Sequence, residues 1–172
     1  MKEGWATRPL GELCRIEIGG TPPRGVSKFW DEKKTTDNVW LSIADMPKTL
    51  HARIFSSAEH LSDEGAKRVK KVKAGTLLVS FKLTLGRLAY ADLDLRTNEA
   101  IAALEPLDET SLNKEYLYWY LKFFDWQKAA EGEDKVKGKT LNKAKLAKID
   151  VLVPPLSEQQ RIVAILDDVF AG

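Results

Sequence analysis

The sequence predicts an α+β fold, with a small mixed or antiparallel β-sheet, helices packed on it and a final helix that projects away. Short β-branched and aromatic runs are separated by Gly and Pro clusters, a long apolar stripe at helical spacing follows them, and a pair of prolines precedes the last helix. The 172 residues, 44% of them hydrophobic, are enough for one buried core.

The N-terminal part is expected to be a strand-like or mixed segment over residues 5–18. It leads into residues 19–23, Gly-Gly-Thr-Pro-Pro, which must form irregular backbone. Residues 39–43 are β-branched and aromatic and predict a strand, and residues 53–55 predict a second short strand after the break at Pro47.

A short helix and a hairpin are expected next. Ser62 has N-cap chemistry and two acids follow it, so a helix is predicted from there to Val69. Residues 76–81 and 86–90 predict two strands joined by residues 82–85 as a polar tip.

A further strand and the main helix follow. Residues 100–104 predict the strand, and Asn113 is expected to cap a helix from Lys114 to about Ala130. Its apolar side chains recur at helical spacing, so it is predicted to pack on the sheet.

The C-terminal part begins with an exposed loop over residues 131–140. A short helix over 141–148 and a strand over 149–153 follow, and Pro154 and Pro155 stop the strand. Ser157 and Gln160 have the spacing of a capping box at the start of the last helix.

Composition excludes several classes of protein. Charged residues make up 30% of the chain, and no run approaches the ~18 apolar residues that span a bilayer. The N-terminus lacks the apolar region of a signal peptide and Cys14 has no internal partner, so a cytoplasmic protein is expected. The net charge of +2 is too small to predict a nucleic-acid partner.

The sequence contains no recognisable catalytic or metal-binding motif. His51 and His60 have no Cys or carboxylate at metal-ligand spacing, and Cys14 has no identifiable His partner. Residues 19–20 lack the pattern of a phosphate-binding loop, and 153–156, Val-Pro-Pro-Leu, lack the polar and aromatic residues of an adenine methyltransferase motif. We therefore expect a protein without enzyme activity, cofactor or metal of its own.

Several motifs, taken in order, resemble the target recognition domain of type I restriction-modification specificity (S) subunits. They are residues 19–24 (GGTPPR), 29–30 (FW), 39–46 (VWLSIADM), 77–80 (LLVS), 97–101 (TNEAI) and 153–163 (VPPLSEQQRIV). The last is similar to the family's entry into its spacer helix and is the most specific. The resemblance covers residues 5–170.

The resemblance implies a single recognition domain, a half-subunit that reads one half of a bipartite double-stranded DNA target. Residues 1–153 would form the DNA-binding domain and 154–172 the start of the spacer or dimerisation helix. The chain would act with methyltransferase (M) and restriction or motor (R) subunits, and as a homodimer or with a second recognition domain. S-adenosylmethionine would be bound by the M subunit, and no membrane partner is implied.

Three loops are candidates for DNA contact, because cations on loops held by a rigid scaffold suit phosphates and base edges. For the first of them, a structural turn with solvated charges is an equal explanation. The first spans 21–28, the second is the hairpin tip 82–87, and the third spans 135–140. Their candidate residues are Thr21, Arg24, Lys28, Lys82, Thr84, Arg87, Lys135, Lys137, Lys139 and Thr140.

Other residues are less specific. The basic run 67–73 surrounds a predicted helix and has a solvated helix as an equal explanation. Trp119 and Trp126 are predicted to lie in the core rather than to stack on bases. The last helix is expected to contact a partner through Leu156, Ile162, Ile165, Leu166 and Val169.

The alternative function, from the class of interaction proteins, is an assembly subunit that docks methyltransferase subunits and binds DNA only weakly alone. Charge reversal at Lys135, Lys137 and Lys139 that leaves assembly intact would favour it. The target bases depend on loop geometry and DNA shape, which a single sequence does not determine.

Overall fold

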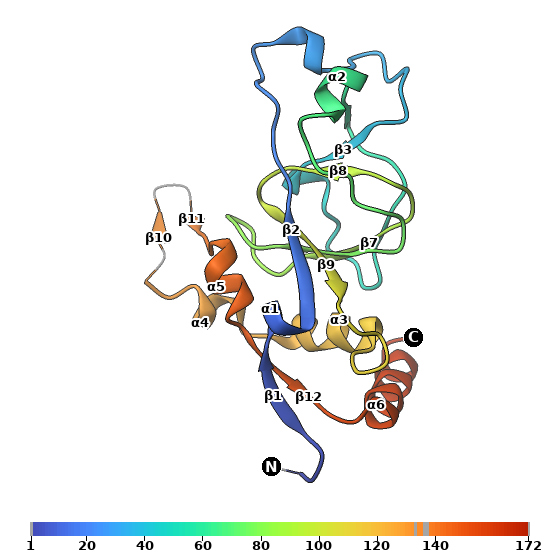
Figure 1. Ribbon diagram of the computed structural model, residues 1–172, viewed down its shortest axis with the longest axis vertical. Coiled ribbons are helices and arrows are strands. Elements are labelled where there is room, and N and C mark those ends of the chain that lie inside the picture. The colour runs from blue at the N-terminus through green and yellow to red at the C-terminus, as the bar shows by residue number, and fades with distance from the viewer. Residues whose placement is uncertain (1, 133, 136–137, 172) are drawn as a thin grey trace.

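The computed structural model describes residues 2–132, 134–135 and 138–171, and it confirms the α+β class. The molecule is elongated, with a small sheet at one end, a larger sheet in the middle and the two longest helices at the other end (Figure 1). Among the described residues, no helix combines the length and the apolar character that a membrane span needs.

A five-stranded sheet forms the centre of the molecule. Its strand order is β2 (Cys14–Ile18), β9 (Ile101–Pro106), β6 (Leu77–Ser80), β7 (Leu88–Ala91) and β4 (Arg53–Ile54). Neighbours are antiparallel except β4 and β7, which are parallel. The predicted hairpin is confirmed as β6 and β7, and the predicted strands at 53–55 and 100–104 correspond to β4 and β9.

Both faces of this sheet are covered, which explains its continuous apolar runs. Successive side chains of a strand point to opposite faces. Accordingly Leu77 and Val79 of β6 belong to the larger core with the helices, whereas Leu78 packs in a second core with Ile54 and Ala89. A strand buried on both sides has no polar face to show in its sequence.

A three-stranded sheet lies at the end of the molecule far from the two longest helices (Figure 1). Its order is β5 (Glu59–His60), β3 (Val39–Leu41) and β8 (Arg96–Thr97). Beside it lie the short helices η1 (Ser27–Phe29), η2 (Ile43–Asp45) and α2 (Asp63–Ala66). Ser62 caps α2 as predicted, but α2 ends three residues before Val69.

The segments near the two ends of the chain run side by side at the other end of the molecule. β1 (Ala6–Pro9) pairs with β12 (Asp150–Val153), and α1 (Leu10–Leu13) contacts α5 (Lys143–Ala147). The main helix α3 (Lys114–Phe123) is capped by Asn113, as predicted, and packs against α6 (Leu156–Val169).

The predicted helix from Lys114 to Ala130 is wrong in its length. Phe124 is extended, with ψ 140°, and a separate helix α4 (Trp126–Ala129) follows. The side chain of Asp125 accepts a hydrogen bond from the backbone N–H of Lys128, and this cap starts a new helix instead of continuing the old one.

The predicted capping box at Ser157 is also wrong. Helix α6 begins at Leu156, one residue earlier, so Ser157 lies inside its first turn. The backbone O of Pro155 accepts from the N–H groups of Glu158 and Gln159, and no side chain caps this end. A capping box does occur at η2, between its N-cap residue Ser42 and Asp45, three residues later.

The segment predicted as a ten-residue loop contains a small hairpin. Asp134–Lys135 (β10) and Gly138–Lys139 (β11) pair as antiparallel strands. The helix and strand predicted after it are confirmed as α5 and β12.

Candidate nucleic-acid interface

The tip of the β6–β7 hairpin is held in place by backbone contacts. The backbone N–H of Gly86 donates to the carbonyl O of Ser80 (2.9 Å), and that of Arg87 donates to the Ser80 hydroxyl (2.9 Å). Ser80 is fully buried. The loop that connects the two strands is therefore anchored on the rigid central sheet, as a recognition loop requires.

Glycine at position 86 is required by both conformation and space. Its φ is +78°, and a Cβ there would lie 2.4 Å from Cδ1 of Trp126. Trp126, which donates from Nε1 to the carbonyl of Leu121 (2.9 Å), supports the tip from α4. The tip can contact α4 this closely because glycine has no side chain at position 86.

The cations of this tip lie at its two ends. Arg87 donates from Nη1 to the carbonyl O of Met46 (3.1 Å), which uses one of its five N–H donors. Lys82 has its Nζ 5.3 Å from the centre of the Phe81 ring. Among the described residues, no carboxylate lies within ion-pair distance of Lys82 or Arg87, so both charges are uncompensated there.

The structure brings the second and third predicted loops together. Lys82 and Thr140 form an antiparallel bridge, and the backbone N–H of Leu141 donates to the carbonyl O of Phe81 (3.0 Å). The hairpin of β10 and β11 therefore continues directly from the β6–β7 tip. Lys137 lies outside the described residues, and so do the side chains of Lys135 and Lys139.

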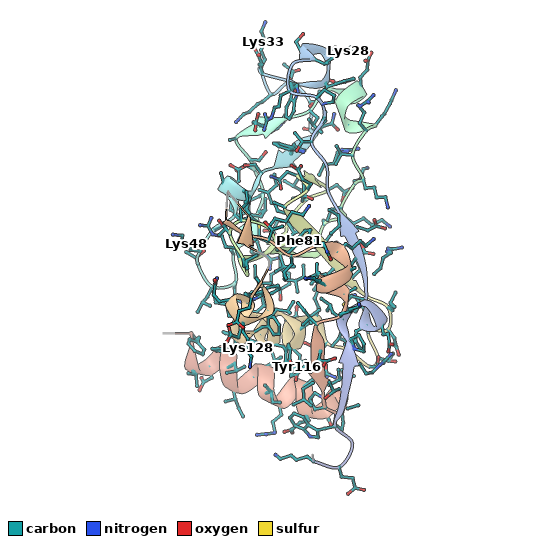
Figure 2. The ribbon with its side chains drawn as sticks, turned by 90° about the vertical axis from the view of Figure 1, so that its left-hand side faces the viewer. Lys28, Lys33, Lys48, Phe81, Tyr116 and Lys128 are labelled. Atoms are coloured by element: carbon teal, nitrogen blue, oxygen red, sulfur yellow. The ribbon has the colours of Figure 1, made fainter. Side chains whose placement is uncertain are left out.

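The first predicted loop lies elsewhere. Lys28 lies at one end of the long axis, whereas Phe81, which precedes the hairpin tip, lies near the middle of the molecule (Figure 2). Its cations and Thr21 have acidic partners: Arg24 pairs with Glu59 through both terminal nitrogens, and Thr21 donates to Glu99. The Nζ of Lys28 lies 3.5 Å from a Glu64 oxygen.

Arg24 is held on aromatic rings as well as by Glu59. Its guanidinium carbon lies 4.2 Å from the centre of the Trp30 ring and 4.9 Å from that of Trp40. The two indoles meet edge to face at 5.1 Å. Glu59 is 35 positions away in the sequence, so no local signal could have predicted that it neutralises Arg24.

The basic run 67–73 does not form one surface. α2 ends at Ala66, so these residues do not surround a helix. Lys70 pairs with Glu17 (2.6 Å) and Lys71 with Asp94 (3.7 Å). The guanidinium of Arg68 lies 4.6 Å from the centre of the Phe29 ring. The run is thus divided among several partners.

The tryptophans of the helices lie in the core, as predicted. Trp119 is 1% exposed and Trp126 is 6% exposed. Trp119 donates from its indole Nε1 to the carboxylate of Asp167 (2.8 Å), which ties α6 to α3. Neither ring is available for stacking on a base.

The predicted partner residues of the last helix fall into two groups. Ile162 and Leu166 are partly buried against the main core, and Leu156 is half-buried. Ile165 and Val169 are 47% and 65% exposed. This second pair lies near the exposed end of the helix, where Phe123 and Phe170 are also exposed.

The described residues contain no group of three or more His, Cys, Asp or Glu that could hold a metal ion. Burial raises the pKa of the Cys14 thiol to about 12, so it is protonated at neutral pH. The ring of His51 stacks on Tyr118, and Nδ1 of His60 lies 2.8 Å from the carbonyl O of Thr36.

The chain is similar to proteins of one family along its whole described length. Residues 2–171 match a family model described as a type I restriction modification DNA specificity domain. The EcoR124I/EcoR124II type I specificity subunit of Escherichia coli is 30% identical over 179 residues, which cover 96% of this chain and 41% of the relative. The MjaIX specificity subunit of Methanocaldococcus jannaschii is 22% identical over 170 residues, with 94% and 37% covered.

The solved structures that superpose on this chain come from the same kind of system. The HsdS subunit from Thermoanaerobacter tengcongensis superposes with a TM-score of 0.72 at 25% identity, over 98% of this chain and 38% of that one. A chain from a structure of type I restriction-modification complex assembly gives a TM-score of 0.73 at 25% identity, over 98% and 39%. The chain thus spans about two-fifths of the length of these relatives.

Proposed function

Because the chain belongs to the type I restriction modification DNA specificity domain family, we propose that it recognises a specific sequence in double-stranded DNA. In this role it reads one half of a bipartite target and directs methyltransferase and restriction subunits to it. The chemistry and the S-adenosylmethionine site lie on the methyltransferase subunit, and this chain acts without catalysis or cofactor of its own.

The observation that supports this function best is the bridge between Lys82 and Thr140. It joins the hairpin tip 82–87 to the segment 135–140, and both carry basic residues that suit phosphates. Residues 135–149 contain six lysines and no Asp or Glu, and residues 76–91 contain Lys82 and Arg87 and no acid. Two segments without acids that meet at this bridge suit the phosphate backbone, and polar tip residues suit base edges.

The first loop has a different part in this proposal. Arg24, already paired with Glu59 and stacked on Trp30, has little net charge to give to a phosphate. Its fixed position suits selective contact with a base or with a neighbouring subunit rather than general attraction. A pocket of about 390 Å³ beside it is lined by Trp30, Asp31, Glu59 and His60.

We also propose the division of the chain into a recognition domain, residues 1–153, and the start of a spacer helix, residues 154–172. Pro154 and Pro155 separate the two. The exposed Ile165 and Val169 suit a contact with a second recognition domain or another copy of the chain.

A specific observation favours the assembly role as a second candidate. A groove of about 440 Å³ between α3 and α6 is lined mainly by aromatic and aliphatic side chains, among them Trp119, Phe123 and Leu166. An apolar groove beside exposed Phe123 and Phe170 suits a protein partner better than DNA.

The decisive experiment is selection from a randomised duplex pool by the chain alone and by the chain mixed with its cognate methyltransferase subunit. Enrichment of a short or split motif is expected. A Lys82→Glu variant should lose retention, whereas Lys33→Glu, the same charge change at the far end of the molecule (Figure 2), should not. No enrichment in either mixture would leave the assembly role.

A further inference from the structure

The apex of the β6–β7 tip is a single exposed leucine in a strained turn. Leu83 has a φ of +64°, and the backbone N–H of Thr84 donates to the carbonyl O of Lys82 (2.7 Å). A hydrogen bond from residue i+2 to residue i around a positive φ is a γ-turn of the rare form. A branched apolar side chain is an unfavourable choice for this backbone, which Gly or Asn adopts more readily.

The two leucines of the tip have opposite environments. Leu85 is partly buried against the main core, whereas Leu83 is 47% exposed. Packing against the core therefore explains why position 85 is a leucine. It explains neither the positive φ of Leu83 nor the exposure of its side chain. Strain of this kind at an ordered position is a reason to look for a function.

The tip is anchored to the body of the protein beside this strained turn. Ser80 binds the backbone of both Gly86 and Arg87, and Gly86 is packed on Trp126. These contacts fix the C-terminal side of the turn that carries Leu83 to the central sheet and to α4. A side chain that is held outward by its scaffold loses little entropy when it binds.

The surroundings of Leu83 indicate what it contacts. Lys82 precedes it, Arg87 follows the turn, and Lys82 is bridged to Thr140 of the lysine-rich segment 135–149, which contains no Asp or Glu. Uncompensated cations around one apolar group suit a polyanion with an apolar feature. In a DNA groove, the apolar group of the bases is the C5 methyl of thymine, which faces the major groove, and a two-stranded ribbon fits that groove.

We propose that Leu83 is a specificity-determining residue whose side chain contacts the methyl group of a thymine in the target duplex. The assignment rests on the proposed function, which it deepens. Lys82 and Arg87 place the tip by their contacts to phosphates, and Leu83 reads one base through an apolar contact.

The test begins with the motif that the complex of the chain and its methyltransferase subunit enriches from the duplex pool. Each thymine of that motif is then replaced by deoxyuridine, which lacks only the methyl group, and the dissociation constant is measured. At one position the wild-type complex should bind about fourfold more weakly, the effect of one buried methyl group. Leu83→Asn and Leu83→Gly should bind the thymine duplex more weakly and show no difference between thymine and uracil there.

Stability and a matched control separate this effect from misfolding. Both variants suit a positive φ, so their melting temperatures should be no lower than that of the wild type. Leu107→Asn, which changes a leucine that is 62% exposed and lies after β9, should keep the full methyl dependence.

Two results would overturn the assignment. One is equal binding of thymine and uracil at every position of the motif; the other is a methyl dependence that survives in both Leu83 variants. Either leaves sequence-specific binding intact, whereas a pool without any enriched motif would reject the proposed function itself.

Discussion

The side-chain amide of Gln159 joins helix α6 to the residues that begin helix α3 at Asn113. Its Oε1 accepts from the backbone N–H of Asn113 (2.8 Å), and its Nε2 donates to the carbonyl oxygens of Ser111 (2.8 Å) and Pro154 (2.9 Å). Gln159 is fully buried, so these bonds satisfy polar groups that water does not reach. The final helix is thus attached to the body at its first turn.

Replacement of Gln159 by Leu should destabilise the protein by about 3 kcal/mol, because it leaves three backbone groups without partners in a buried place. Urea unfolding measures the free energy. Gln160→Leu, at the exposed neighbouring position, is the control and should change it by less than ~0.5 kcal/mol. Equal effects of the two substitutions would contradict this account.

Two adjacent glycines should differ sharply in their tolerance of alanine. A Cβ at Gly19 would lie 2.0 Å from the carbonyl O of Thr97, while one at Gly20 would meet nothing within 4 Å. Gly19→Ala should therefore destabilise the chain by about 2 kcal/mol or more, and Gly20→Ala by less than ~0.5 kcal/mol. Thermal unfolding of the pair checks this, and similar melting temperatures would show that the backbone at Gly19 adjusts freely.

The turn after Trp30 should weaken in acid. The carboxylate of Asp31 accepts from the backbone N–H of Thr36 (2.7 Å) and from the Thr35 hydroxyl (3.3 Å), and these bonds lower its pKa to about 2. A lowered carboxyl pKa gives stability that is fully present above the unfolded value of 3.8 and is lost as the pH falls through about 2.

Carboxyl NMR titration should place the Asp31 pKa in that low range, and Asp31→Asn should remove the corresponding part of the pH dependence of stability. A pKa of Asp31 near 3.8 would show that the two bonds do not persist in solution.

The thiol of Cys14 should be inert in the folded protein. It is 2% exposed, and burial raises its pKa to about 12, so the reactive thiolate is scarce at about pH 8. Iodoacetamide followed by mass spectrometry should show no labelling of the native chain and full labelling in urea. Rapid labelling without urea would mean that β2 opens often.

The lysines of residues 135–139 should determine much of the salt dependence of DNA binding. Lys135→Gln and Lys139→Gln each remove a charge without reversing it, and the removal of each phosphate interaction should reduce the slope of log K against log salt by about 0.9. Lys33→Gln, at the far end of the molecule, should leave the slope unchanged. If both substitutions left the slope unchanged, the β10–β11 hairpin would not bind phosphates.

Local chemistry explains why much of the fold was predictable. The caps at Ser62 and Asn113, the β6–β7 hairpin and the stop at Pro154 depend on residues within a few positions of one another. Long apolar runs also indicated strands, although they could not show that both faces of the sheet are buried.

The errors arose where a nearby alternative competed with the predicted element. Asp125 begins a second helix within the apolar stripe that predicted one long helix. The last helix starts at Leu156, so Ser157 lies in its first turn. The glutamine that is buried and forms hydrogen bonds is Gln159, whereas Gln160 was predicted to complete the capping box. Such shifts of one residue depend on packing against other elements, which periodicity does not contain.

The sequence by itself determined the family, the fold class and the loops that carry cations, because motifs in order and local spacing are written along the chain. Tertiary structure alone decided which loops contact each other and which basic side chains are paired with a carboxylate. Lys82 meets Thr140 across 58 positions, and Glu59 reaches Arg24 across 35. Pairing over such separations is set by the packing of the whole core, so no local pattern could record it.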